Sequence, residues 1–271
     1  MEQFRVFGNP IAQSKSPYIH QEFAMQTQQA MNYQSELVEL GQFEVAVKKL
    51  IANQGKGANV TAPFKEQAFA LCNQLSERAR LAGAVNTLIF SNGVIYGDTT
   101  DGIGLVSDLL RHQIQLQNSN ILLLGAGGAA KGVVQAILEQ APKSLTIANR
   151  TLSKAQAIAD QYPHAEVNAV TFEATEHLIF DIIINATSVG LSGVNLPISD
   201  QTISSASTCY DMVYGLEPTA FLKQAKLLDV DNIIDGLGML VGQAAASFYL
   251  WRNVRPDVEP VLAALRKQLS Q

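Results

Sequence analysis

The sequence has few of the residues that disulfide-bonded and metal-binding proteins need. Of its 271 residues only two are cysteines and four are histidines. Cys72 and Cys209 lie far apart with no cysteine pair at short spacing, so we expect neither a disulfide framework nor a zinc site. Reduced cysteines of this kind are typical of intracellular proteins. The four histidines show no metal-ligand spacing either, and no metal is predicted.

The sequence also lacks long apolar runs and an excess of positive charge. No apolar run approaches the roughly 20 residues that span a bilayer. Its start, Met1-Glu-Gln-Phe4, shows no basic region followed by an apolar stretch, so no signal peptide is predicted. The net charge of −5 argues against nucleic acid, which requires a basic surface. We expect a soluble cytoplasmic protein with no membrane partner and no nucleic-acid partner.

Hydrophobic residues, in contrast, are abundant in the sequence. Hydrophobic residues make up 47% of the chain and charged residues 16%, which excludes disorder and suffices for one large domain or two ordinary ones.

The most informative stretch is Asn120–Ala130. Ile121–Leu124 is typical of a strand buried on both faces, and a helical apolar spacing follows at Val133, Val134, Ile137 and Leu138.

The segment between that strand and that helix predicts a dinucleotide site. It reads Gly125-Ala126-Gly127-Gly128-Ala129-Ala130. Gly125 permits a tight turn, Gly127 lets the backbone approach a pyrophosphate, and Ala130 lets the helix pack on the strand. The first N–H groups of the helix then face the phosphates. A bare glycine turn is the alternative, and the next motif favours the cofactor.

That next motif follows the second strand and indicates NADP rather than NAD. An NAD enzyme usually carries an acid about 20 residues past the glycines, where it accepts a hydrogen bond from the ribose 2′-OH. This chain has Asn149, Arg150, Thr151 and Lys154 there. A guanidinium, a hydroxyl and an ammonium bind a 2′-phosphate, whereas an acid repels one. Alternatively, Arg150 and Lys154 are solvated loop and helix residues.

Alternating strands and helices predict a parallel, doubly wound sheet for the second half of the chain. We expect its strands near residues 120–124, 144–148, 180–185, 207–211 and 232–235. Polar residues follow the strands that end at Asn185 and Asp211, and ligands bind at that edge of such sheets. Helices 239–251 and 257–269 come after the last strand, and we expect them to pack on the first domain.

The first half of the chain reads as a smaller α/β domain. We expect a strand at Phe4–Pro10, a helix over 17–30 with Pro17 at its first position and Ser16 as its cap, a strand at 33–40 and a helix at 43–51. Asn92-Gly93 predicts a hairpin. The domains are then 1–101, completed by 237–271, and 102–236.

Several polar residues of the first half allow two interpretations each. Ser14 and Ser16 either cap a helix or bind a carboxylate at its end. Lys65, beside Asn59 and Thr61, is either a surface lysine or a functional one, because helix N-termini disfavour lysine. Asp101 either caps a helix or acts in a site, and Gln243 of a later helix either packs or binds.

Together these stretches resemble the shikimate dehydrogenase family over nearly the whole length. In the first half the resemblance is carried by Ser14-Lys-Ser-Pro17, Asn59-Val-Thr-Ala-Pro-Phe-Lys65, Ala84-Val-Asn-Thr87 and Gly97-Asp-Thr-Thr-Asp-Gly102. In the second half it is carried by the glycine turn, Ala148-Asn-Arg-Thr151, Asn185–Gly190, Tyr210–Tyr214 and Gly236–Ala244. One departure is Thr99, where the family pattern usually has Asn.

The resemblance implies a two-domain α/β fold, with an N-terminal substrate domain and a Rossmann-like NADP domain. It implies reversible NADPH-dependent reduction of 3-dehydroshikimate to shikimate in aromatic amino-acid biosynthesis, with Lys65 and Asp101 as the catalytic pair. The implied substrate residues are Ser14, Ser16, Asn59, Thr61, Lys65, Asn86, Asp101, Tyr214 and Gln243. The cofactor residues add Thr187, Ser188, Met212, Val213, Gly236 and Met239 to the two motifs above.

Two alternatives stay open at this point. One is a quinate/shikimate dehydrogenase that prefers NAD. Such relatives tend to carry an acid just after the arginine, and Thr151 at that position argues against this alternative. The other is a non-catalytic NADP-binding regulator, which predicts an intact glycine turn beside a broken Lys65–Asp101 pair. For the oligomeric state we expect a monomer or a homodimer.

Overall fold

The structure is a computed structural model in which residues 1–187, 189 and 195–270 are described. Contacts between residues divide the chain into a first unit, Met1–Gly104 with Leu240–Gln268, and a second unit, Leu105–Met239. The sequence placed the corresponding boundaries after residues 101 and 236. In the structure both crossings fall inside helices, α5 (Asp101–Arg111) and α10 (Leu237–Arg252).

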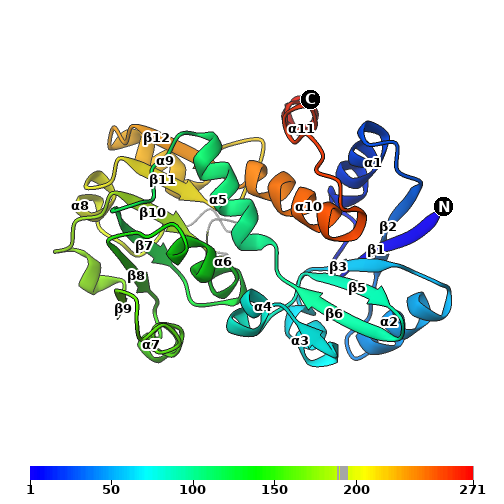
Figure 1. The fold of residues 1–271 in the computed structure, drawn as a ribbon. Coiled ribbons are helices and arrows are strands. Elements are labelled where there is room, and N and C mark those ends of the chain that lie inside the picture. Colours follow the sequence, from blue (N-terminus) through cyan, green and yellow to red (C-terminus); the bar gives the residue numbers. More distant parts are fainter. Residues whose placement is uncertain (188, 190–194, 271) are drawn as a thin grey trace. The chain divides into compact units, whose positions relative to one another are not determined.

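The second unit contains a six-stranded sheet in which every pair is parallel (Figure 1). Its strands are β7 (Asn120–Leu124), β8 (Ser144–Ala148), β9 (Val167–Val170), β10 (Ile182–Asn185), β11 (Thr208–Asp211) and β12 (Asn232–Asp235), in the order β12-β11-β10-β7-β8-β9. The predicted doubly wound, Rossmann-like sheet is confirmed, because this order reverses direction between β7 and β10. The prediction missed β9, a short and half-buried edge strand.

Helices cover both faces of this sheet because the strand residues alternate between two cores. Ile121 and Leu123 pack with α5, α6 (Gly128–Leu138) and α7 (Leu152–Ala159). Leu122 and Leu124 pack with α8 (Asp200–Ser204) and α9 (Ala220–Leu227), near the short helix η1 (Glu173–Thr175). All four aliphatic residues of β7 are fully buried, as expected of a strand covered on both sides.

The first unit has its own six-stranded sheet, of mixed direction. Its strands are β1 (Glu2–Gly8), β2 (Met31–Leu37), β3 (Gly57–Val60), β4 (Gln74–Leu75), β5 (Thr87–Ser91) and β6 (Val94–Asp98), in the order β2-β1-β3-β5-β6-β4. The predicted hairpin joins β5 to β6 through Asn92 and Gly93, whose φ angles of 50° and 77° are those of a type I′ turn.

Two groups of helices pack on the two faces of this sheet. Phe7, Ala58 and Leu88 face α2 (Phe43–Ala52), α3 (Lys65–Leu71) and α4 (Glu77–Ala82). The alternate residues of the strands face α1 (Ser16–Gln26) and α10, where aromatic rings gather around Trp251. The last helix, α11 (Glu259–Leu269), buries Val261, Leu262 and Leu265. These C-terminal helices thus belong to the first unit as far as Gln268.

Some predicted element bounds were wrong. Helix α1 ends at Gln26 and β2 at Leu37, earlier than the sequence suggested. Ser16 is the first residue of α1 and not its cap: Lys15 occupies the cap position, and the Ser16 N–H donates to Ser14 Oγ. Between Lys65 and Ala82 the chain forms two helices, α3 and α4, because the short strand β4 separates them.

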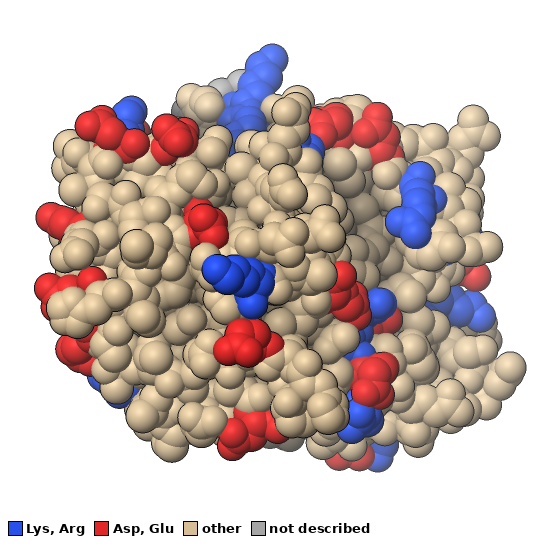
Figure 2. Space-filling model, turned by 60° about the vertical axis from the view of Figure 1, so that its left-hand side comes forward, with Lys and Arg blue, Asp and Glu red and all other residues tan. Residues whose placement is uncertain are grey.

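Charges of neither sign dominate the face drawn in Figure 2. Acidic and basic side chains are interspersed there and separated by uncharged residues. Among the described residues, no helix combines the length and apolarity that crossing a bilayer requires.

Candidate active site

Lys65 and Asp101 form a direct ion pair in the first unit. The Lys65 ammonium donates to Asp101 Oδ2 at 2.6 Å. Each residue begins its helix, Lys65 in α3 and Asp101 in α5, so two helix starts hold the pair. The lysine side chain is 25% exposed and the aspartate side chain 11%, so the lysine stays partly accessible while the aspartate is largely covered.

Asn86 holds the other oxygen of the Asp101 carboxylate. Its amide donates to Asp101 Oδ1 at 2.8 Å and to Thr100 Oγ1 at 3.0 Å, and its oxygen accepts from the Thr100 backbone N–H. Asn86 is 3% exposed, so these bonds are screened little by water. The Asp101 carboxylate is therefore fixed at both oxygens.

A second ion pair holds the backbone just before Asp101. Arg78 of α4 donates to both oxygens of Asp98, at 2.8 and 2.6 Å, and to the Thr99 carbonyl at 3.0 Å. Ser76 adds a hydrogen bond to Asp98 at 2.5 Å. Thr99, the departure from the family pattern, is buried beside this pair. The fork of a guanidinium suits such a planar clamp, which an ammonium does not make.

Ser14, Ser16 and Thr61 lie at the ends of elements that start or finish close to the same sheet edge. Ser14 Oγ accepts from the Ser16 N–H at the start of α1. Thr61 directly follows β3, and its N–H donates to the Phe7 carbonyl of β1. These residues lie where β1 and β3 finish in parallel. Hydroxyls at such an edge, beside a helix start, are suited to an anionic ligand.

The remaining predicted substrate residues belong to different parts of the chain. Gln243 of α10 lies 3.4 Å from Thr100 Oγ1, so it belongs to the group around Asn86. Asn59 is 6% exposed and lies inside the first unit. Tyr214 belongs to the second unit, where burial and the nearby charge of Asp235 raise the pKa of its phenol. Ser188 lies outside the described residues.

The glycine turn of the second unit has the geometry of a phosphate cradle. Gly125 has a φ of 107°, which only glycine adopts without strain, and Gly127 caps α6 with no side chain bonded to the helix start. A Cβ at Gly127 or Gly128 would meet nothing within 4 Å, so the backbone N–H groups border open space. Ala130 is fully buried against the sheet. These residues fit a dinucleotide pyrophosphate.

The turn after β8 fits the 2′-phosphate of NADP. Asn149 bonds the Thr151 carbonyl at 2.9 Å and shapes the turn, leaving the side chains of Arg150, Thr151 and Lys154 exposed. Within the described ranges, neither Arg150 nor Lys154 has a protein partner for its charge. No acid stands in the segment from Asn149 to Lys154, so the donor set there is cationic.

The other predicted cofactor residues border the same sheet edge. The Thr187 methyl lies 3.0 Å from where a Cβ of Gly125 would stand, so the turns after β7 and β10 touch. Gly236 leaves no room for a Cβ against the Met212 backbone, and its N–H donates to the Val213 carbonyl. Ala126 and Met239 share one core cluster with Met212.

Several residues that hold the site carry no signal in the sequence. Arg78 and Asp98 lie 20 positions apart, and no local pattern links them. His20, Tyr33 and Ser247 surround Asn59 from three different elements. Burial lowers the pKa of His20 to about 3 and raises the pKa of Tyr33 well above its usual value, with a smaller opposing effect from a hydrogen bond to Ser16.

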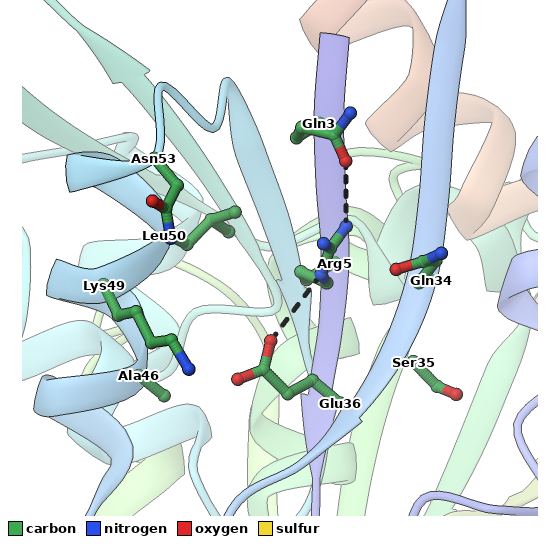
Figure 3. Close-up of a pocket in the computed structure, with 9 residues that line it drawn as sticks. All are labelled: Gln3, Arg5, Gln34, Ser35, Glu36, Ala46, Lys49, Leu50 and Asn53. Carbon is green, nitrogen blue, oxygen red and sulfur yellow. Dashed lines mark hydrogen bonds and ion pairs between the residues drawn. The ribbon is translucent and has the colours of Figure 1, made fainter. Parts of the chain in front are cut away.

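A hollow in the first unit is lined by none of the predicted site residues. Figure 3 shows it between α2 and strands β1 and β2, with a volume of about 280 Å³ and an Arg5–Glu36 ion pair of 3.6 Å on its wall. Among the described residues, no three of His, Cys, Asp and Glu gather as metal ligands would.

Three protein-family models match successive parts of the chain. Residues 6–88 match the shikimate dehydrogenase substrate binding domain, and residues 108–195 match the shikimate / quinate 5-dehydrogenase family. Residues 236–266 match the shikimate 5′-dehydrogenase C-terminal domain.

Individual relatives extend the likeness to the full length. A protein of Colwellia psychrerythraea named shikimate dehydrogenase (NADP(+)) is 54% identical over 268 residues, which covers 99% of this chain and 98% of the relative. The crystal structure of an Ael1 enzyme from Pseudomonas putida is 40% identical, with a TM-score of 0.95 over 100% of this chain and 99% of that one. Shikimate 5-dehydrogenase from Thermus thermophilus, solved with NADP(H) and shikimate, is 31% identical, with a TM-score of 0.89 over 99% and 100% of the two chains.

Proposed function

This chain belongs to the shikimate dehydrogenase family, and we propose that it catalyses the reversible NADPH-dependent reduction of 3-dehydroshikimate to shikimate. The observation that carries the proposal is the Lys65–Asp101 pair beside Asn86, in a chain that also has a phosphate-binding glycine turn. A non-catalytic regulator would have no need of the pair. The domains are assigned accordingly, with the first unit for the substrate and the second for the cofactor.

Lys65 is the proton donor in this proposal. Bound NADPH supplies the hydride, and the substrate carbonyl oxygen then gains negative charge as its carbon is reduced. The Lys65 ammonium stabilises that charge and gives a proton to the oxygen. In the oxidation direction the neutral amine takes the proton from the substrate hydroxyl. Asp101 holds the ammonium by its Oδ2, which leaves the other ammonium hydrogens for the substrate.

The other polar residues of the first unit bind and orient the substrate. Ser14 and Ser16 hold its carboxylate at the start of α1, and Thr61, Asn86, Asp101 and Gln243 hold its hydroxyls. Tyr214 is proposed as a further contact. The role of Asn59 is considered below, because its position differs from that of the others.

The cofactor residues make NADP the preferred nicotinamide nucleotide. The backbone of Gly125–Ala130 holds the pyrophosphate, and Asn149, Arg150, Thr151 and Lys154 hold the 2′-phosphate. Thr187, Ser188, Met212, Val213, Gly236 and Met239 border the nicotinamide side. Cationic side chains after β8, without partners among the described residues, support this assignment.

The experiment that tests the function identifies the product. The protein is mixed with NADP and shikimate, and then with NADP and quinate, and NADPH and the oxidised product are quantified together. We expect 3-dehydroshikimate and NADPH in equal amounts from shikimate. Oxidation of quinate at a similar rate would assign the chain to the broader quinate/shikimate enzymes, and bound NADP without turnover would make it a regulator.

The partners follow from this function. We propose that the chain acts in the cytoplasm as a monomer or a homodimer on small molecules alone. Its net charge of −5 supports the absence of a nucleic-acid partner.

A further inference from the structure

Asn59 is surrounded by protein hydrogen bonds on every side. Its oxygen accepts from Tyr33 at 2.7 Å and from His20 Nε2 at 3.2 Å. Its amide nitrogen lies 3.1 Å from the Asn86 carbonyl, 3.2 Å from Thr87 Oγ1 and 3.0 Å from Ser247 Oγ. A primary amide offers two hydrogens and two lone pairs, so these protein contacts use the bonding capacity of the Asn59 side chain.

The donor and acceptor types of the neighbouring groups determine which way this amide is oriented. The Asn86 carbonyl can only accept, so the NH₂ group of Asn59 must face it. The Asn59 oxygen then faces His20 and Tyr33, which must both donate. Burial lowers the pKa of His20 to about 3, so the ring is neutral at physiological pH and carries its proton on Nε2.

His20 is itself held by rings and not by charges. It stacks on Tyr33 with centroids 4.2 Å apart, and its other ring contacts are Phe23, Phe248 and Trp251. Its Nδ1 is buried without a partner among the described residues. Leaving a buried nitrogen unpaired costs about 1–3 kcal/mol. The unpaired Nδ1 agrees with a neutral ring whose proton is on Nε2, from which it donates to Asn59.

Hydrogen bonds continue from Asn59 to the catalytic pair. Ser247 Oγ, which accepts from Asn59, lies 3.1 Å from Thr100 Oγ1. Thr100 in turn bonds Asn86. Asn86 donates to Asp101. Every bond of this path lies within the first unit. Because Asn86 and Thr100 define where the Asp101 carboxylate stands, a shift at Asn59 or Ser247 moves the group that orients Lys65.

We propose that Asn59 is a buried hub, fixed by His20 and Tyr33, which acts through Ser247, Thr100 and Asn86 to orient the Asp101 carboxylate against Lys65. His20, Tyr33, Asn59 and Ser247 are then positioning residues of the reaction. The inference rests on the proposed function and deepens it, because it gives Asn59 a positioning role in the same reaction.

Two conservative variants test the hub and leave Asn59 with its other hydrogen-bond partners. Tyr33→Phe keeps the ring stacked on His20, which still donates to the Asn59 oxygen. Ser247→Ala leaves the Asn86 carbonyl and Thr87 as acceptors for the Asn59 amide. Both variants are expected to fold, which thermal unfolding verifies. The matched control is Ser119→Ala, another buried serine whose hydroxyl bonds a backbone carbonyl, at the start of β7.

The readout is the separation of kcat from KM for shikimate with saturating NADP. We expect both hub variants to lower kcat by about 3- to 30-fold while KM changes by less than about threefold, because a misoriented pair slows proton transfer more than binding. Ser119→Ala should leave both constants unchanged. An unchanged kcat in the hub variants, or an equal loss in the control, would overturn the inference. So would a tenfold rise in KM at constant kcat, which would show that the hub variants act on substrate binding and not on the reaction step.

The two proposals fail differently in this experiment. An inactive native protein would refute the proposed function, and the hub role with it. An active native protein with fully active hub variants would refute the hub role alone.

Discussion

Lys65 and Asp101 are joined by a 2.6 Å hydrogen bond although 36 positions separate them in the sequence. Each stands at the first residue of a helix, and the Asp101 carboxylate is also held by Asn86 at 2.8 Å. The lysine therefore has a fixed counterion on one side and an accessible ammonium on the other. A proton donor for a reduced carbonyl requires both properties.

Asp101→Asn removes the charge but keeps the shape of this partner. We expect kcat for shikimate oxidation to fall by about 10²–10³, since an amide orients the Lys65 ammonium less firmly and no longer stabilises its charge. Steady-state kinetics with saturating NADP measure this. A native kcat in Asp101→Asn would mean that Asp101 has only a structural role. Glu66→Gln serves as a control, because it removes a carboxylate one position after Lys65.

Arg78→Ala breaks the clamp that holds the backbone before Asp101. Asp98 is 1% exposed, so losing its guanidinium leaves a buried charge without its ion pair. We expect a loss of about 2–4 kcal/mol in the free energy of unfolding, measured by urea denaturation. Arg80→Ala, two residues later on the same helix, removes only an exposed pair with Glu77 and should leave the midpoint nearly unchanged. Equal effects of the two variants would contradict the clamp.

Arg150→Gln tests the binding of the 2′-phosphate. A charge-assisted hydrogen bond to phosphate contributes about 1.5–3 kcal/mol, so KM for NADP should rise by about 10- to 100-fold while KM for NAD stays the same. Lys143→Gln is the matched control, because it removes the same charge just before β8 and not after it. A parallel rise for NADP and NAD would place Arg150 elsewhere than at the 2′-phosphate.

His20 gives the stability of the protein a pH dependence. Burial lowers its pKa to about 3 from the ordinary 6.5, so below pH 6.5 the unfolded chain binds a proton that the folded one does not. This contribution to stability is complete above pH 6.5 and is lost as the pH falls from 6.5 towards 3, by about 1.4 kcal/mol per pH unit.

The comparison of two histidine variants isolates that effect. His20→Gln keeps an amide donor for Asn59 and should flatten the decline of the unfolding free energy between about pH 6.5 and 4.5. His164→Gln replaces an exposed histidine and should leave the decline as in the native protein. Identical pH profiles for native protein and His20→Gln would show that the histidine is not buried neutral.

The second unit was predictable from sequence because its signals are local. Four aliphatic residues before Gly125 predict β7, and the buried strands that end at Asn185 and Asp211 are equally continuous. Strand β9 was missed because Val167–Val170 is short and only partly buried. Ser16 was wrongly predicted to cap α1, since spacing alone does not distinguish a cap from a first helical residue.

The candidate site was predictable only in part, because its contacts are distant in sequence. Lys65, Asp101 and Asn86 were identified from the resemblance to a family. The spacing of residues in the sequence could not show that these three side chains lie together. Neither spacing nor resemblance indicated the link from Asn59 to Ser247, which spans 188 positions and depends on how α10 packs on the sheet. Contacts of this kind follow from tertiary packing, and local patterns do not encode them.

The kinetics of Lys65→Ala with shikimate and NADP test the role of Lys65 as proton donor most directly. We expect kcat to fall by about 10²–10⁴ with a smaller change in the shikimate KM, because the variant loses the proton donor and acceptor but keeps the other ligands. A tenfold rise in KM with kcat intact would contradict this role and make Lys65 a binding residue.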